Sequence, residues 1–357
     1  MILWSDQTAK RGIHTGWIKD MKKISIVIPC YNEVENVALM AFTADNVLRE
    51  ALPRYDYEIL FIDNCSTDGT REALEEVCAA NRKVKAIFNV TNFGQFNSPF
   101  YAMCQASGDC VVCMCCDFQD PVELIPRFVE EWENGHKIVS GVKTSSKESR
   151  ALYFLRTLYY KTIQNMSATE LIEHFTGFGL YDQSFIRLLR ELDDPVPFIR
   201  GIVAEYGKGF NRVEVPYRQE KRRAGKTHNS FYSLYDAAML SFTSYTKVGL
   251  RLATFLGFGA SAASLCVALY YLMYKLTHWY TFQAGNAPMV VGIFLLGSVQ
   301  LFFIGLLGEY ILNINTRVIH RPLVVEEKRL NFEETGSSRP DFKNMEETRE
   351  RMPGRDT

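Results

Sequence analysis

The fold is decided near the start of the chain by Ile24-Ser25-Ile26-Val27-Ile28-Pro29, a β-rich apolar run that a proline ends. This run predicts a buried strand, and residues 35–52 follow it with apolar side chains at helical spacing. The alternation then repeats, with strands expected at 58–62, 84–88, 110–114 and 137–140 and helices at 70–80, 97–107 and 122–133. The pattern predicts an α/β domain with a mostly parallel sheet and helices on both faces.

Polar loops follow three of these strands. They are Pro29–Glu33, Asp63–Asp68 and Asp117–Asp120. The carboxyl ends of parallel strands lie along one edge of a sheet, and such sheets bind ligands at that edge. We therefore expect one site to which all three loops contribute.

Composition narrows the class of protein. The 357 residues carry a formal net charge of −1, so we expect no binding to nucleic acid. Residues 1–21 contain charges and no apolar core, which predicts a flexible extension and not a signal peptide. Four of the nine cysteines crowd the segment 110–116, and buried thiols in a reducing compartment explain them better than zinc, whose ligand pairs need a turn between them.

Two uncharged segments, 252–274 and 288–308, predict a transmembrane hairpin within residues 249–312. As helices they would be roughly 35 and 31 Å long. Small residues in the first segment suit close contact within the hairpin or between subunits of a homo-oligomer. A cytoplasmic location of both flanks is indicated by the cations at the hairpin's outer ends, Lys247, Arg251, Arg317 and Arg321. We expect an inner-membrane, multi-pass protein with its catalytic domain and both termini in the cytoplasm.

Two more segments, 151–166 and 229–248, predict aromatic-rich amphipathic helices with cations nearby. They fit packing on the sheet domain, and they also fit a position in the membrane interface beside the hairpin. Residues 313–357 are highly charged, and we expect an exposed or partly disordered tail.

Six motifs carry a family resemblance. In chain order they are Ile28-Pro29-Cys30-Tyr31-Asn32-Glu33, Ile62-Asp63-Asn64-Cys65-Ser66-Thr67-Asp68-Gly69-Thr70, Asn92-Phe93-Gly94, Asp117-Phe118-Gln119-Asp120-Pro121, Gly177-Phe178-Gly179-Leu180-Tyr181-Asp182 and Arg222-Arg223-Ala224-Gly225-Lys226-Thr227. Their order and spacing, followed by the hairpin, resemble the polyprenyl-phosphate glycosyltransferases of glycosyltransferase family 2 from about Lys22 to Arg321. Bactoprenol glucosyltransferases and dolichol-phosphate mannosyltransferases belong to this group.

The resemblance implies a GT-A, Rossmann-like domain over residues 22–228 and an inverting hexosyltransferase of the EC 2.4 class. The expected reaction moves a sugar from a nucleotide sugar, with a UDP-sugar favoured, to a membrane lipid such as undecaprenyl phosphate, for cell-surface glycan assembly. A GDP-mannose-dependent dolichol-phosphate enzyme is one alternative. Another is a catalytically silent membrane protein that binds sugar nucleotides.

The resemblance also assigns roles to residues. Asp117 and Gln119 would hold Mg²⁺ or Mn²⁺ against the diphosphate, since these ions prefer hard oxygen ligands. Asp117 and Asp182 would be catalytic, although Asp182 could equally cap a helix over 185–192. The donor nucleotide would be bound by Pro29, Tyr31, Glu33, Asp63 and Asn92. The acceptor or its phosphate would be bound by Arg218, Arg222 and Lys226, unless these cations belong to a juxtamembrane segment that meets anionic lipid.

The chain departs from the family pattern at several positions. Cys115 stands in place of the first Asp of the metal motif, and Asn64 in place of the second Asp of the nucleotide loop. Gly177 and Gly179 replace the Asp and Arg of the dolichol-type segment. These differences leave the donor sugar open and fit a branch other than the mannose enzymes.

Overall fold

The computed structural model describes residues 21–145, 172–192, 194, 197–225, 286–318 and 322–332, with scattered positions between 235 and 277. Several predicted features lie outside these residues. They are residues 1–20 of the extension, the helix over 151–166, most of the helix over 229–248, most of the segment 252–274, and Lys226.

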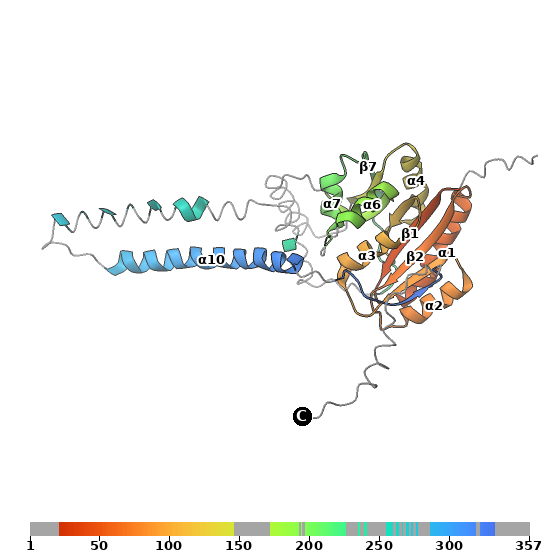
Figure 1. The fold of residues 1–357 in the computed structure, drawn as a ribbon, viewed down its shortest axis with the longest axis horizontal. Helices are drawn as coiled ribbons and strands as arrows, with labels where there is room; N and C mark the ends of the chain where they lie inside the picture. Colours follow the sequence, from red (N-terminus) through yellow and green to blue (C-terminus); the bar gives the residue numbers. More distant parts are fainter. Residues whose placement is uncertain are drawn as a thin grey trace, which may run out of the picture.

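The described chain is built on an eight-stranded sheet with the strand order β7-β5-β6-β4-β1-β2-β3-β8 (Figure 1). Strand β6 pairs antiparallel with β4 and β5, and β8 pairs antiparallel with β3. The other pairs are parallel, which confirms the mostly parallel sheet. The strands are β1 Lys23–Cys30, β2 Asp56–Asp63, β3 Val84–Asn89, β4 Cys110–Cys113, β5 Ile138–Ser145, β6 Phe175–Asp182, β7 Arg212–Arg218 and β8 Glu326–Leu330.

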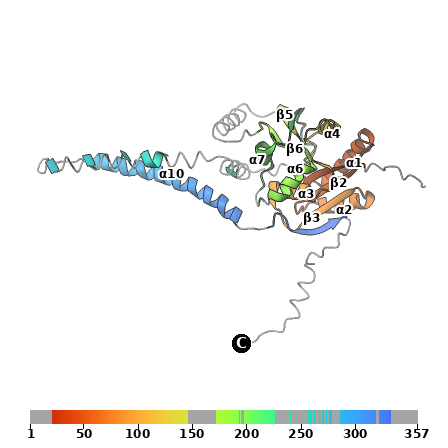
Figure 2. The same ribbon diagram turned by 45° about the horizontal axis from the view of Figure 1, so that its top comes forward.

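Helices cover both faces of this sheet (Figures 1 and 2). The core on one face includes side chains of α1, α2 and α4, and the core on the other includes side chains of α3, α6 and α7. The helices are α1 Val34–Ala51, α2 Thr70–Ala80, α3 Gly94–Gln105, the 3₁₀ turn η1 Val122–Leu124, α4 Ile125–Glu133, α6 Gln183–Leu192, α7 Ile199–Tyr206 and α10 Asn286–Val318. The helices predicted within the first 133 residues are thus confirmed, with shifts of a few residues at their ends.

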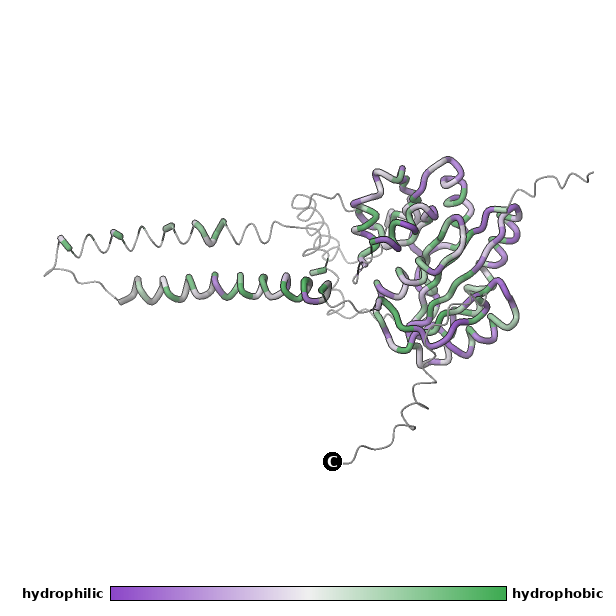
Figure 3. Tube along the Cα trace, viewed as in Figure 1, coloured by the Kyte–Doolittle hydropathy of each residue, from purple (hydrophilic) through white to green (hydrophobic). Residues whose placement is uncertain are grey.

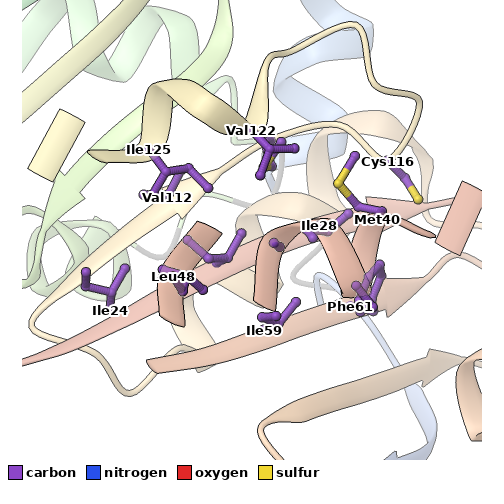
Figure 4. Packing of buried hydrophobic residues seen from close by; sticks show 14 of the residues in the cluster. Ile24, Ile28, Met40, Leu48, Ile59, Phe61, Val112, Cys116, Val122 and Ile125 are labelled. Atoms are coloured by element: carbon purple, nitrogen blue, oxygen red, sulfur yellow. The ribbon is translucent and has the colours of Figure 1, made fainter. Parts of the chain in front are cut away.

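Alternation along each strand divides these two cores, because successive side chains of a strand point to opposite faces. On β1, Ile24, Ile26 and Ile28 belong to the core beneath α1 and α4, whereas Val27 belongs to the other core. Figure 4 shows Ile24 and Ile28 packed with residues of the neighbouring strands and helices. The strand is buried on both faces, which explains why its sequence is apolar at every position from Ile24 to Ile28 except Ser25.

Strand β8 corrects the expectation for the charged tail. Residues 326–330 lie within the segment that we expected to be exposed, yet they form an edge strand beside β3. Val324 is buried, and Leu330 and Phe332 pack against the two cores. The charged side chains between them find partners on α2 and α3, so this part of the tail belongs to the sheet domain.

Helix α10 is one continuous helix of 33 residues that extends away from the sheet (Figure 1). It contains the second uncharged segment, 288–308. Within the part of the chain that the structure describes, no helix has both the length and the apolarity needed to cross a membrane.

Candidate active site

The three predicted polar loops meet at one edge of the sheet. Cys30 and Asp63 are register partners at the carboxyl ends of β1 and β2, and the Asn64 amide donates to the Cys30 carbonyl over 3.0 Å. At the end of β4 the Met114 amide donates to the Val27 carbonyl of β1 over 3.1 Å. The loops after these strands therefore share an edge.

Asp63 is the last residue of β2, and its side chain is 0% exposed. The Ser66 amide donates to both carboxylate oxygens, at 3.3 and 3.2 Å, and Nε of Arg71 lies 3.4 Å from Oδ2. Burial raises the pKa of Asp63, while the Ser66 hydrogen bonds and the charge of Arg71 act against that rise. Asp63 is thus a hydrogen-bond acceptor held in one position, and the Ser66 amide and Arg71 partly offset the cost of burying its charge.

A guanidinium links two further carboxylates. Arg222 donates to Glu33, and its Nη1 lies 3.5 Å from Oδ2 of Asp117. Asn36 donates to the other oxygen of Glu33 over 2.6 Å. Burial raises the pKa of Glu33, and the Asn36 hydrogen bond and the Arg222 charge oppose the rise. Arg222 is therefore the positively charged partner of both Glu33, after β1, and Asp117, after β4.

Arg222 is brought there by the segment that follows β7. The Glu220 amide donates to the Gln119 carbonyl over 3.1 Å, and the Arg223 amide donates to the Asp117 carbonyl over 3.2 Å. Asn36 of α1 also lies 3.4 Å from the Ala224 carbonyl. The R-x-A-G segment thus lies against the predicted metal loop.

In the loop 117–120, which contains the predicted metal ligands, Asp117 and Asp120 have different roles. Oδ1 of Asp117 accepts the Gln119 amide at 3.1 Å, and its other oxygen faces Arg222. Asp120 is buried and accepts the Tyr217 hydroxyl at 2.7 Å and the Cys115 amide at 3.3 Å. Asp120 therefore anchors the loop to β7, which leaves Asp117 for the site.

Cys115 itself is solvent-exposed. Among the described residues, no group of three or more His, Cys, Asp and Glu side chains is arranged to hold a metal ion. A metal at this edge would depend on Asp117, the Gln119 oxygen and the substrate phosphates, which is the pattern typical of Mg²⁺ bound with nucleotides.

An amide network supports the nucleotide side of the site, and sequence analysis missed it. The Asn64 amide group donates to Asn92 at 2.7 Å and to the Gly94 carbonyl at 3.3 Å. Its oxygen accepts the Phe93 amide at 2.8 Å and the Ser98 hydroxyl at 2.9 Å. Asn64 thereby fixes the Asn-Phe-Gly loop, and its departure from the family's Asp was the available signal.

Of the remaining predicted donor and acceptor residues, Pro29 and Tyr31 lie half-buried at and just after the end of β1. Asn92 is exposed, and its side-chain oxygen accepts the hydrogen bond from Asn64. Arg218 is exposed at the end of β7. Lys226 lies outside the described residues.

Asp182 is not brought to this edge with Asp117, and its catalytic role stays a prediction. It pairs in register with Cys110, the first residue of β4, whereas Asp117 follows the last residue of that strand. Its carboxylate accepts the Ser184 amide at 2.9 Å at the start of α6 and the Trp132 indole N–H at 2.8 Å. Hydrogen bonds from Ser184 and Trp132 outweigh the effect of burial and lower the pKa of Asp182. The helix-capping alternative fits this geometry.

Comparison with known proteins shows which family the chain belongs to. The model of "Glycosyl transferase family 2" matches residues 25–190. The uncharacterized glycosyltransferase YkoT of Bacillus subtilis (strain 168) is 31% identical over 84% of this chain and 89% of its own length. The chain belongs to glycosyl transferase family 2. This family 2 enzyme is a glycosyltransferase, as the motifs predicted.

Other relatives extend the similarity beyond the matched domain. The SfII prophage-derived bactoprenol glucosyl transferase of Shigella flexneri is 29% identical over 86% of this chain and 98% of its own length. Among solved structures, glucosyl-3-phosphoglycerate synthase from Mycobacterium tuberculosis aligns with a TM-score of 0.44 and 16% identity, covering 62% of this chain and 78% of that one.

Proposed function

We propose that this family 2 enzyme transfers a sugar, with inversion, from a UDP-sugar to a polyprenyl phosphate such as undecaprenyl phosphate. The observation that carries the donor half is the gathering of Glu33, Asp63 and Asp117 at one sheet edge with Arg222 between two of them. The acceptor half is supported by relatives named bactoprenol glucosyl transferase, which match along almost their whole length.

The donor nucleotide would lie over the ends of β1 and β2. Pro29 and Tyr31 would contact the base and ribose, and the rigid Asp63 carboxylate would accept a hydrogen bond from the base or ribose. Asn92, held by Asn64, would lie beside the nucleotide. Glu33 would orient Arg222 towards the diphosphate, where a planar guanidinium can bind phosphate oxygens through two hydrogen bonds.

Asp117 and Gln119 would hold Mg²⁺ or Mn²⁺. The fit rests on their hard oxygen atoms, which are the ligands that these ions prefer. The bound ion would stabilise the departing nucleoside diphosphate as a Lewis acid. Asp117 would keep its position because the Gln119 amide donates to one of its oxygens.

The acceptor phosphate would attack without a strong general base. A phosphate monoester is largely a dianion at pH 7, because its second ionisation lies near pH 6. The chain's task is to neutralise and orient that phosphate. We assign Arg218 and Lys226 to it, with Arg222 lying where it would meet phosphate oxygens of the donor and of the acceptor.

The lipid acceptor requires the protein to work at a membrane, and we propose an inner-membrane enzyme anchored by a hairpin of segments 252–274 and 288–308. Helix α10, which contains the second segment, is coloured as mostly hydrophobic in Figure 3, and many of its large apolar side chains are exposed. They include Ile293, Leu301, Phe302, Ile304 and Ile311. Such a surface needs an apolar cover, and acyl chains would supply it. The cations flanking the hairpin favour a cytoplasmic catalytic domain with both termini on the same side.

The decisive experiment is a donor screen with the purified full-length protein. Labelled UDP- and GDP-sugars are each mixed with a short-chain polyprenyl phosphate, with Mg²⁺, Mn²⁺ or EDTA, and the lipid product is identified by mass spectrometry. Metal-dependent product from a UDP-sugar supports the proposal, and product from GDP-mannose alone moves it to the dolichol-type reaction. Nucleotide binding without any transfer would support the silent alternative, which the presence of Cys115 in place of the first Asp of the metal motif favours.

A further inference from the structure

The C-terminal strand reaches the donor side of the site through one side chain of α2. Arg71 places its Nε 3.4 Å from Oδ2 of Asp63 and donates from Nη2 to Glu327 of β8 over 2.6 Å. Arg71 and Glu327 are separated by 256 residues in the chain. This contact therefore joins the nucleotide loop to the strand that follows α10.

The three strands beneath Arg71 are in register. Asp63 of β2 pairs with Phe88 of β3, and Phe88 pairs with Lys328 of β8. The guanidinium lies over the Phe88 ring, 5.2 Å from its centroid. Arg71 thus spans from β2 to β8 across an aromatic surface, which restricts its orientation.

A β-bulge in β8 sets the direction of the Glu327 side chain. Phe88 pairs with Lys328 and the next residue, Asn89, pairs with Glu326, so Glu327 is the extra residue of β8. Bulges locally redirect side chains. Here the redirected carboxylate meets Arg71.

Other contacts fix β8 at this position beside β3 and α2 (Figure 2). Lys328 pairs with Glu75 over 2.9 Å, and Arg329 donates to Gln105 of α3 over 2.8 Å. The Asn331 amide donates to the carbonyls of Cys78 and Val84, each at 2.7 Å. Glu327 is therefore a stationary partner for Arg71.

We propose that Arg71 is a positioning residue for Asp63 and that Glu327 sets its orientation, so that the C-terminal strand controls how tightly the nucleotide binds. The inference rests on the proposed function, in which Asp63 accepts a hydrogen bond from the donor. A fully buried carboxylate needs a nearby positive charge to remain an ionised acceptor. Arg71 supplies that charge, and Glu327 keeps Arg71 from turning to solvent.

The expected effects differ in size. Arg71→Gln should weaken nucleotide binding roughly tenfold, because it removes a charged partner of a buried acceptor. Glu327→Gln should weaken binding roughly threefold, because its ion pair is part-exposed and acts through Arg71. The turnover number at saturating donor should change little in either variant, because neither side chain touches the reacting groups.

The test is calorimetric titration of UDP and of GDP into the purified full-length protein. Glu75→Gln is the matched control: it breaks the Lys328–Glu75 pair between the same strand and the same helix, on side chains that do not contact Asp63. We expect Glu75→Gln to bind as the unmodified protein does. Asp63→Asn combined with Arg71→Gln should be no weaker than Asp63→Asn alone, since both act on one group.

Three results would overturn the inference. Equal binding by the Glu327→Gln and Glu75→Gln proteins would remove β8 from the mechanism, and additive losses in the double variant would remove Asp63. Failure of the unmodified protein to bind UDP or GDP would overturn the proposed function and this inference with it. If Arg71→Gln unfolds, Arg71→Lys replaces it, and recovery of binding there supports a role for the charge.

Discussion

Arg222 donates a hydrogen bond to the carboxylate of Glu33, although 189 residues separate the two in the chain. The same guanidinium lies 3.5 Å from Asp117, so it is shared by the loops that follow β1 and β4. The segment after β7 thereby closes over the edge of the sheet where the donor diphosphate would lie.

This arrangement predicts that lysine cannot replace Arg222. Arg222→Lys keeps the charge and loses the planar fork that reaches two carboxylates. We expect kcat/KM for sugar transfer to fall at least tenfold, a loss of about 1.4 kcal/mol, and to fall further in Arg222→Met. Steady-state kinetics with the donor found in the screen would measure it. Arg49→Gln on the surface of α1 is the control, and an unchanged rate in Arg222→Met would exclude Arg222 from the site.

Restoring the family's residue at position 64 should harm this protein. Asn64→Asp removes the donors to Asn92 and the Gly94 carbonyl and places a carboxylate against the Asn92 oxygen. We expect a loss of about 2–3 kcal/mol and a fall in Tm of roughly 5–10 °C. Thermal unfolding would test this beside Asn46→Asp, whose oxygen would still accept from Arg49. A Tm equal to that of the unmodified protein would show that the amide donors are dispensable.

Glu58 predicts an acid-sensitive contribution to stability. Burial acts to raise its pKa, but hydrogen bonds from Lys85, Ser25, Ser107 and Lys23 outweigh burial and lower the pKa to about 2 from 4.5. The unfolded chain therefore binds a proton first as the pH falls. The stabilisation, roughly 3 kcal/mol, is complete above pH 4.5 and is lost as the pH falls through about 2.

Chemical denaturation between pH 7 and pH 2 would show this loss. Glu58→Gln should be less stable at pH 7 and should lose less stability between pH 4.5 and pH 2 than the unmodified protein. Glu76→Gln, at an exposed position of α2, should follow the unmodified protein. Parallel curves for Glu58→Gln and the unmodified protein would show that another group dominates in this range.

Elements of the fold could be predicted from the sequence where the spacing of apolar residues or a single motif determines the structure. The strands at 24–28 and 58–62 and the helix over 70–80 were predicted because apolar spacing alone distinguishes them. Strand β8 was missed because Glu326, Glu327, Lys328 and Arg329 show no apolar alternation, and their partners are 253 and 256 residues away in the pairs with Glu75 and Arg71. Local pattern carries no information about such pairings.

Some residues of the candidate site could be placed from the sequence and others could not. Loops that follow strands of a parallel sheet must meet at one edge, so Glu33, Asp63 and Asp117 could be placed together from the sequence. Asp182 could not be placed, because the motif that contains it lies on an antiparallel strand, whose register decides which edge each residue reaches. The link from Asp63 through Arg71 to Glu327 depends on a bulge that no motif signals.

The two aspartates that the motifs made catalytic should therefore behave differently. Asp117→Asn should abolish transfer with the fold intact, since Asp117 is the carboxylate that we assign to the metal. Asp182→Ala should keep the turnover number within about threefold and lose about 1–2 kcal/mol of stability, because it removes the acceptor for Ser184 at the start of α6 and for Trp132. Transfer assays and thermal unfolding on the same preparations would separate these outcomes. Near-normal transfer by Asp117→Asn would refute the metal assignment, and a folded Asp182→Ala protein that binds nucleotide without transfer would return Asp182 to the catalytic residues.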